Sequence, residues 1–153
     1  MAAYFFDTSA LVKYYHPEAG SDRVAAIFGE NGRRVLISKL GFLEIQSVFA
    51  IKVRTGQMDR EDAGLQRANL FIYVADRAIE VFQMTSEHFT SAERLVGRYS
   101  FVHRVRTLDA LQLAVALDLR ESGQLDHFVA ADKALLEVAR LEGFSVLNPE
   151  EAF

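Results

Sequence analysis

The interpretation of this 153-residue chain starts from residues 3–7, AYFFD. The short apolar run is typical of a strand in a parallel sheet that helices cover. Asp7 then stands at the carboxyl end of that strand, which is the edge where open parallel sheets bind ligands. Asp is also a favoured N-cap residue, so for Asp7 alone a cap on a helix over 9–15 is an equal alternative.

Outward from this stretch, short apolar runs alternate with longer segments of helical periodicity. This alternation predicts an α/β fold with a central parallel sheet flanked by helices. The expected strands are 3–6, 35–38, 79–83, 128–131 and 144–147. The expected helices are 9–15, a segment capped by Ser21 or Asp22, the Glu44 segment stopped by Gly56, 59–75, 86–99, 107–122 and 132–142.

Length and composition fit one domain over 1–153. Apolar residues make up 50% of the chain and charged residues 25%, which is too apolar for a disordered protein. The absence of cysteine excludes disulfides, zinc–thiolate sites and thiol nucleophiles, so any metal must be held by oxygen or nitrogen. No signal segment or membrane span is expected, and the cytoplasm is therefore the default location.

The net charge of −4 argues mildly against binding of a polyanion by bulk charge. A local contact remains open, because basic residues gather in three places. Solvated surface is the alternative interpretation of each. The clusters are Arg33 with Arg34, Lys52 with Arg54, and Arg98 with His103, Arg104 and Arg106.

Two acids fall on apolar helical faces. Glu44 has helical spacing with Leu40, Val48 and Ile51, so its carboxylate should point where the apolar stripe points. Asp109 lies in a helix that is apolar nearly all round, where the helix dipole could stabilise it in the first turn. Burial of an unpaired carboxylate costs several kcal/mol, so such residues need a cation, a partner or a pocket.

Asp132 resembles Asp7, because it follows the apolar run 128–131 and opens a helix. In a parallel sheet, Asp7, Glu44, Asp109 and Asp132 can converge on one mouth, where they would repel one another unless cations lay between them. Oxygen ligands without cysteine favour Mg²⁺ or Mn²⁺. Two such ions about 3.5–4 Å apart can activate a water and stabilise the leaving oxygen of a phosphodiester.

The residues also resemble a known family over nearly the whole chain. The matching stretches are 4–21 (YFFDTSALVKYYHPEAGS), 37–56 (ISKLGFLEIQSVFAIKVRTG), 107–117 (TLDALQLAVAL) and 128–150 (FVAADKALLEVARLEGFSVLNPE). In combination they are similar to the PIN-domain family, and more narrowly to the VapC-type toxin nucleases of bacterial toxin–antitoxin pairs.

This resemblance implies a PIN-like fold and a Mg²⁺- or Mn²⁺-dependent endoribonuclease. Asp7, Glu44, Asp109 and Asp132 match the acidic quartet of the family, as catalytic residues and metal ligands, and Ser9 matches a small polar position of the pocket. The implied partners are an RNA substrate, a second copy of the chain in a homodimer, and a VapB-type antitoxin whose tail enters the active-site groove.

One departure keeps an alternative open. The family often has Ser or Thr two residues before the last acid, whereas this chain has Ala130, which supplies no hydroxyl. We therefore expect a weakened metal position near Asp132, and a PIN-like protein that binds RNA or an antitoxin with weak or no cleavage is the alternative function. A haloacid-dehalogenase-like phosphatase needs a second acid where Ser9 stands, and a receiver domain needs acids where Phe5 and Phe6 stand.

The remaining functional residue types carry weaker signals. The histidines show no metal-ligand spacing and are interpreted as surface or core residues; they are His16, His88, His103 and His127. Most aromatic residues fall on apolar faces, where core packing is expected. Tyr14, Tyr15 and Tyr99 could alternatively stack on nucleic-acid bases.

Overall fold

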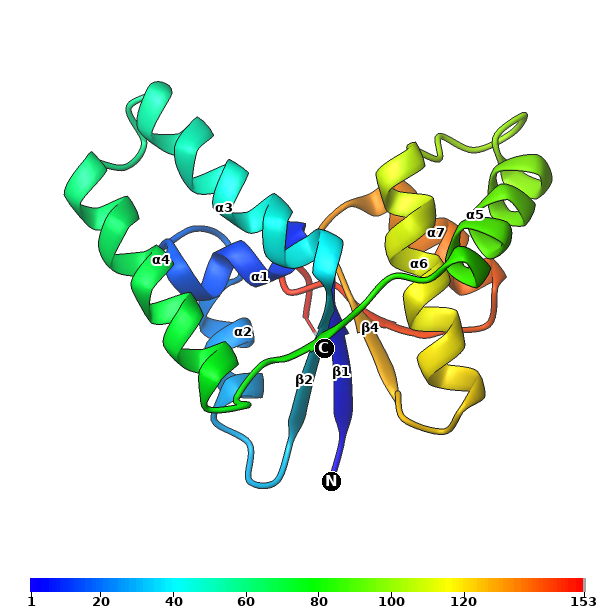
Figure 1. The fold of residues 1–153 in the computed structure, drawn as a ribbon, viewed down its shortest axis with the longest axis horizontal. Coiled ribbons are helices and arrows are strands. Elements are labelled where there is room, and N and C mark those ends of the chain that lie inside the picture. The colour runs from blue at the N-terminus through cyan, green and yellow to red at the C-terminus, as the bar shows by residue number, and fades with distance from the viewer. Residues whose placement is uncertain (153) are drawn as a thin grey trace.

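The first strand lies at the centre of the sheet in the computed structural model, which describes residues 1–152 (Figure 1). All strand pairs are parallel, in the order β3-β2-β1-β4-β5. The strands are β1 (Ala3–Phe6), β2 (Arg34–Ser38), β3 (Glu80–Phe82), β4 (His127–Val129) and β5 (Ser145–Leu147). The expected α/β fold with a central parallel sheet is confirmed.

Helices cover both faces of this sheet (Figure 1). Tyr4 and Phe6 point into one core, against α1 (Thr8–Tyr15), α2 (Ser21–Phe28) and α3 (Lys39–Arg54), with α4 (Arg60–Ala75) adding Leu70. Ala3 and Phe5 point into the other core, against α5 (Ser86–Tyr99), α6 (Thr107–Glu121) and α7 (Lys133–Leu141). Successive residues of β1 thus fill opposite cores, as the alternation of side chains along a strand requires.

The sequence-based boundaries hold to within a few residues, but one helix cap differs from the prediction. Gly20, with φ 89°, caps α2, while the Ser21 hydroxyl contacts the backbone of the preceding turn instead. Arg106 is the N-cap of α6, without a side-chain bond to the helix. Gly56, with φ 77°, follows the end of α3 as expected. Within residues 1–152, no helix is long and apolar enough to cross a membrane.

The strand order reverses between β1 and β4. From β1 the chain adds β2 and β3 on one side, and β4 and β5 complete the other side. Phe6 pairs with Val129, and the backbone N–H of Asp7 donates to the carbonyl of Val129 at 2.9 Å. Open α/β sheets form a crevice outside the carboxyl ends of the strands at such a reversal. Asp7 and Asp132 are therefore placed on either side of the crevice.

The backbone at Gly20 permits a direct test of the fold. A Cβ at Gly20 would lie 2.7 Å from the Pro149 carbonyl oxygen, in a left-handed conformation that side chains rarely adopt. We expect Gly20→Ala to lower the free energy of unfolding, measured in urea, by about 1–3 kcal/mol.

Gly64 is the matched control, because it lies inside α4 and a Cβ at this position would have no other atom within 4 Å. Gly64→Ala should raise the free energy of unfolding by about 0.5–1 kcal/mol. Equal effects of the two substitutions would contradict the close approach of Gly20 to Pro149.

Candidate active site

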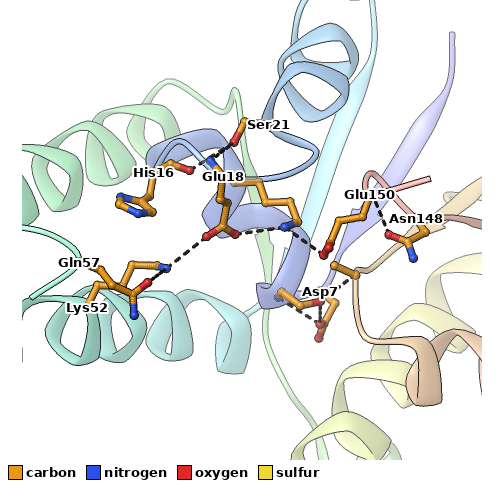
Figure 2. Close-up of polar contacts among 11 residues, drawn as sticks. Asp7, His16, Glu18, Ser21, Lys52, Gln57, Asn148 and Glu150 are labelled. Carbon is orange, nitrogen blue, oxygen red and sulfur yellow. Dashed lines mark hydrogen bonds and ion pairs between the residues drawn. The ribbon is translucent and has the colours of Figure 1, made fainter. Parts of the chain in front are cut away.

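Asp7 is both a helix cap and a buried acid. Its side chain accepts the backbone N–H of Ser9 at 3.1 Å and the Ser9 hydroxyl (Figure 2), and only 5% of the residue is exposed. Burial raises the pKa of Asp7 to about 6, with further increases from Glu44 and Asp132, although the bonds from Ser9 act in the opposite direction. The two interpretations of Asp7 drawn from the sequence are thus compatible.

Ser9 joins two parts of the crevice. Its hydroxyl donates to the Asp7 carboxylate and accepts the backbone N–H of Ala131 at 3.0 Å. Asp7 and Ser9 lie at the start of α1, whereas Ala131 belongs to the segment between β4 and α7. Ser9 therefore orients Asp7 and also fixes the segment that carries Asp132.

Glu44 lies at the border of the buried stripe of α3. Its Oε1 accepts from the Thr8 hydroxyl at 3.1 Å and from Nε2 of Gln112 at 2.8 Å. The stripe itself is formed by Phe42, Ile45, Phe49 and neighbours rather than by the face expected from sequence, and Ile51 is 43% exposed. The carboxylate is half-buried and points towards α1 and α6, because its hydrogen-bond donors lie there.

The polar support of Glu44 was missed by sequence reasoning. Gln112 is fully buried in α6, where it accepts from the Ser38 hydroxyl and donates to Glu44. Ser38 in turn caps α3 by accepting the backbone N–H of Gly41 at 2.9 Å. A glutamine inside the apolar run LQLAVAL was the available signal, since buried polar side chains are hydrogen-bonded.

Asp109 and Asp132 complete the acidic cluster. Asp109 lies in the first turn of α6, and burial raises its pKa to about 7, with contributions from Asp7, Asp132 and Glu44 that Arg106 partly opposes. Asp132 caps α7, because its Oδ1 accepts the backbone N–H groups of Ala134 at 3.0 Å and Leu135 at 3.2 Å. The expected central burial of the Asp109 helix is confirmed, since nearly all of α6 after that residue is buried.

The structure thus brings Asp7, Glu44, Asp109 and Asp132 together in the crevice, and these side chains form what we call the acidic mouth. The carboxylate of Asp109 is repelled by those of the other three acids. The carboxylate of Asp7 is likewise repelled by those of Glu44 and Asp132. They are neighbours rather than a preformed cage: within residues 1–152, no group of three acidic or histidine side chains is arranged to hold one ion. The all-oxygen donor set and the mutual repulsion suit a hard divalent cation, which would draw these side chains together.

A separate set of ion pairs fixes α1 against α3 beside this mouth (Figure 2). Glu18 contacts the ammonium groups of Lys13 and Lys52, each at 3.2 Å, and Lys13 also contacts Glu150 at 3.2 Å. Both lysines are largely buried. Although burial opposes it, the two ammonium groups lower the pKa of Glu18. These ion pairs hold α1, which begins at Asp7, in a set position relative to α3, which carries Glu44.

The basic clusters have different surroundings. Arg34 forms a bidentate ion pair with Glu80, and Lys52 forms an ion pair with Glu18. The third cluster adjoins the acidic mouth, where Nη2 of Arg104 lies 3.8 Å from Oδ1 of Asp132.

The tyrosines are less available for stacking than their type suggested. Tyr15 and Tyr99 are buried, and Tyr14 stacks on Phe28 with ring centroids 3.9 Å apart. Base stacking by these three side chains is therefore the wrong interpretation, because core packing already uses their rings. The buried His88 bonds to Asp118 at 2.8 Å, which agrees with a structural histidine.

The sequence model of the PIN domain family matches residues 4–141 of this chain. The chain belongs to the PIN-domain family. This match spans β1 through α7 and includes every member of the acidic cluster. No curated protein matches the chain in sequence.

Solved structures agree in fold with this PIN-domain chain. VapC20 of Mycobacterium tuberculosis, described as a sarcin–ricin loop cleaving toxin, is 16% identical with a TM-score of 0.66, covering 92% of this chain and 95% of its own. VapBC2 of Rickettsia felis, bound to a promoter DNA fragment, is 13% identical with a TM-score of 0.64, and the match covers 95% of this chain and 98% of that one. FitAcB of Neisseria gonorrhoeae is 14% identical with a TM-score of 0.66, and the match covers 97% of this chain and 99% of that one. At such identities the likeness establishes the fold alone.

Buried Asp7 has a testable effect on stability. A carboxyl group whose pKa is raised on folding binds its proton more tightly in the folded protein, so its contribution to the free energy of unfolding falls as pH rises from about 4 to above 6. Asp7→Asn cannot ionise. In EDTA, the variant should therefore gain about 2–3 kcal/mol relative to the parent between about pH 4 and pH 8, measured by urea unfolding.

Asp59→Asn is the matched control, because Asp59 is an exposed N-cap carboxylate of α4. A difference between parent and Asp7→Asn that stays constant across this pH range would contradict a destabilising buried charge at Asp7.

Proposed function

We propose that this chain is a divalent-metal-dependent endoribonuclease and the toxin of a type II toxin–antitoxin pair. The observation that carries the proposal is the gathering of Asp7, Glu44, Asp109 and Asp132 at the strand reversal, with burial and mutual repulsion raising the pKa of Asp7 and Asp109. Perturbed carboxylates that cluster in a crevice are typical of functional sites. Membership of the PIN-domain family supports a nuclease.

These acids would hold Mg²⁺ or Mn²⁺. Bound divalent ions supply an activated water and stabilise the leaving oxygen of the phosphodiester. The protein's own part is to hold the ligands. Ser9 fixes Asp7, Thr8 and Gln112 fix Glu44, and the start of α7 fixes Asp132. Protons on Asp7 and Asp109 compete with the cation, so metal binding should release protons and strengthen as pH rises through about 6 to 7.

The negative charge of the same acidic mouth also indicates the kind of protein partner. An acidic crevice attracts Arg or Lys side chains as readily as it attracts cations, so a VapB-type antitoxin would place a basic residue against it. Toxin–antitoxin assemblies among the solved structures of this fold support that partner. We further propose a single domain over 1–153 that acts in the cytoplasm as a homodimer.

The proposal predicts metal-dependent cleavage that requires the acids. Purified protein should cut RNA with Mg²⁺ or Mn²⁺ and stop when EDTA is added. Asp7→Asn and Asp109→Asn should each lower the cleavage rate by at least about 100-fold, because each removes a charged ligand while the fold persists. Cleavage is measured on mixed cellular RNA, and folding by thermal unfolding of the metal-free protein.

Asp126→Asn offers a control that changes an acid outside the mouth, since Asp126 bonds to the backbone of Ala3 at the opposite end of β1. Full activity of either Asp7→Asn or Asp109→Asn would refute the assignment of the site.

A protein that binds RNA or an antitoxin with little cleavage is the second candidate function, and Ala130 favours it. Ala130 is fully buried in the core beneath α5, α6 and α7, whereas Val129 faces the other core, as strand alternation predicts. No hydroxyl therefore reaches Asp132 from position 130. A side chain that hydrogen-bonds a metal ligand typically changes metal affinity or activity by about 10–100-fold.

Restoring this hydroxyl tests whether Ala130 weakens the proposed metal site. Ala130→Ser adds one oxygen to a packed site, a smaller change than Thr, which would overfill the core. It should lower the Mn²⁺ concentration needed for half-maximal cleavage, by at most about 10–100-fold. Ala131→Ser is the matched control at the next position. Identical metal dependence in all three proteins would show that the missing hydroxyl is immaterial.

A further inference from the structure

The loop between α5 and α6, residues 100–106, carries most of the third basic cluster, which adjoins the acidic mouth. It carries Phe101, which is 95% exposed, and Val102, which is 83% exposed, followed by His103, Arg104 and Arg106. Figure 1 shows this loop at the end of the molecule where α6 begins. It therefore adjoins the edge at which the acids gather.

Two arginines connect the loop to the acidic mouth. Arg104 reaches Asp132 at 3.8 Å while 63% of its side chain stays exposed. Arg106 is exposed, forms the N-cap of α6 and acts electrostatically on Asp109 in the next turn. Exposed ion pairs at such distances are weak, so both guanidinium groups remain able to bind another anion.

Phe101 has no structural task that explains its position. A phenylalanine that contributes to a core is buried, whereas this ring is almost entirely in solvent. Isolated exposed apolar residues are common, but here the aromatic ring stands three residues from Arg104 and five from Arg106 in sequence, beside a crevice. An aromatic ring interleaved with arginines is the combination that proteins use for single-stranded nucleic acid, with stacking on bases and charge on phosphates.

We propose that residues 100–106 hold a single-stranded segment of RNA at the mouth, with a base stacked on Phe101 and phosphates bound by Arg104 and Arg106. This inference rests on the proposed nuclease function and adds the residues of this chain that hold the substrate. A polyanion approaching a cluster of carboxylates on a chain of net charge −4 needs cations at the rim, and these arginines supply them. A divalent ion that binds Asp132 would release Arg104 from its pair with that carboxylate and leave it for phosphate.

The test measures binding and cleavage separately. A fluorescein-labelled single-stranded oligoribonucleotide of about 12 nucleotides is titrated with protein in the Asp7→Asn background, which is expected to slow cutting by at least about 100-fold, and anisotropy gives Kd. Phe101→Ala should weaken binding by about 5- to 100-fold, and Phe101→Trp should retain it because tryptophan also stacks. Arg104→Gln and Arg106→Gln should each reduce the slope of log Kd against log salt by about 0.7.

In the cleaving protein, Phe101→Ala should raise KM with little change in kcat, since the ring binds substrate without touching the reacting atoms. Ile72→Ala is the control for loss of an exposed apolar side chain, because Ile72 is 54% exposed on α4. Arg140→Gln controls for loss of an exposed arginine on α7. A labelled duplex should bind without dependence on Phe101.

The outcomes separate this inference from the function on which it rests. If the parent cuts RNA while Phe101→Ala, Arg104→Gln and Arg106→Gln bind and cut as the parent does, the inference is overturned and the nuclease stands. If the parent neither binds nor cuts RNA, both fail.

Discussion

The parallel pairing of β1 with β4 is the constraint on which the rest of the structure depends. It puts the first strand in the centre of the sheet, where its side chains alternate between two cores. It also creates the reversal of strand order, with the bond from Asp7 to the carbonyl of Val129 closing the end of the ladder. Because of this pairing, Asp7 and Asp132 share one crevice although they are far apart in the chain.

The carboxylates in the crevice repel one another, and the rest of the fold holds them close together despite this repulsion. Burial and like charges raise the pKa of Asp7 and Asp109, so charged forms of these groups destabilise the metal-free protein near neutral pH. Hydrogen bonds from Ser9 to Asp7 and from Gln112 to Glu44 offset part of that cost and orient the carboxylates. A bound divalent cation would remove the remaining repulsion, which couples ligand binding to stability.

Charge is distributed around the mouth with a clear division of roles. Lys13 and Lys52 are buried against Glu18 and serve to hold α1 and α3 together. Arg104 and Arg106 stay exposed on the loop that borders the acids. Only the second pair is positioned for a polyanion, so an overall negative protein can still present positive charge where a phosphate chain would enter.

The sequence by itself determined the α/β class, the positions of the strands and helices to within a few residues, and the acids worth attention, because periodicity and misplaced charges are local signals. It also determined that α6 is buried. Tertiary structure alone decided that Gln112 and Ser9 support Glu44 and Asp7, that Tyr15 and Tyr99 pack inside, and that Arg104 faces Asp132. Such contacts join residues distant in the chain, and whether a polar or aromatic group is buried depends on what the fold packs against it.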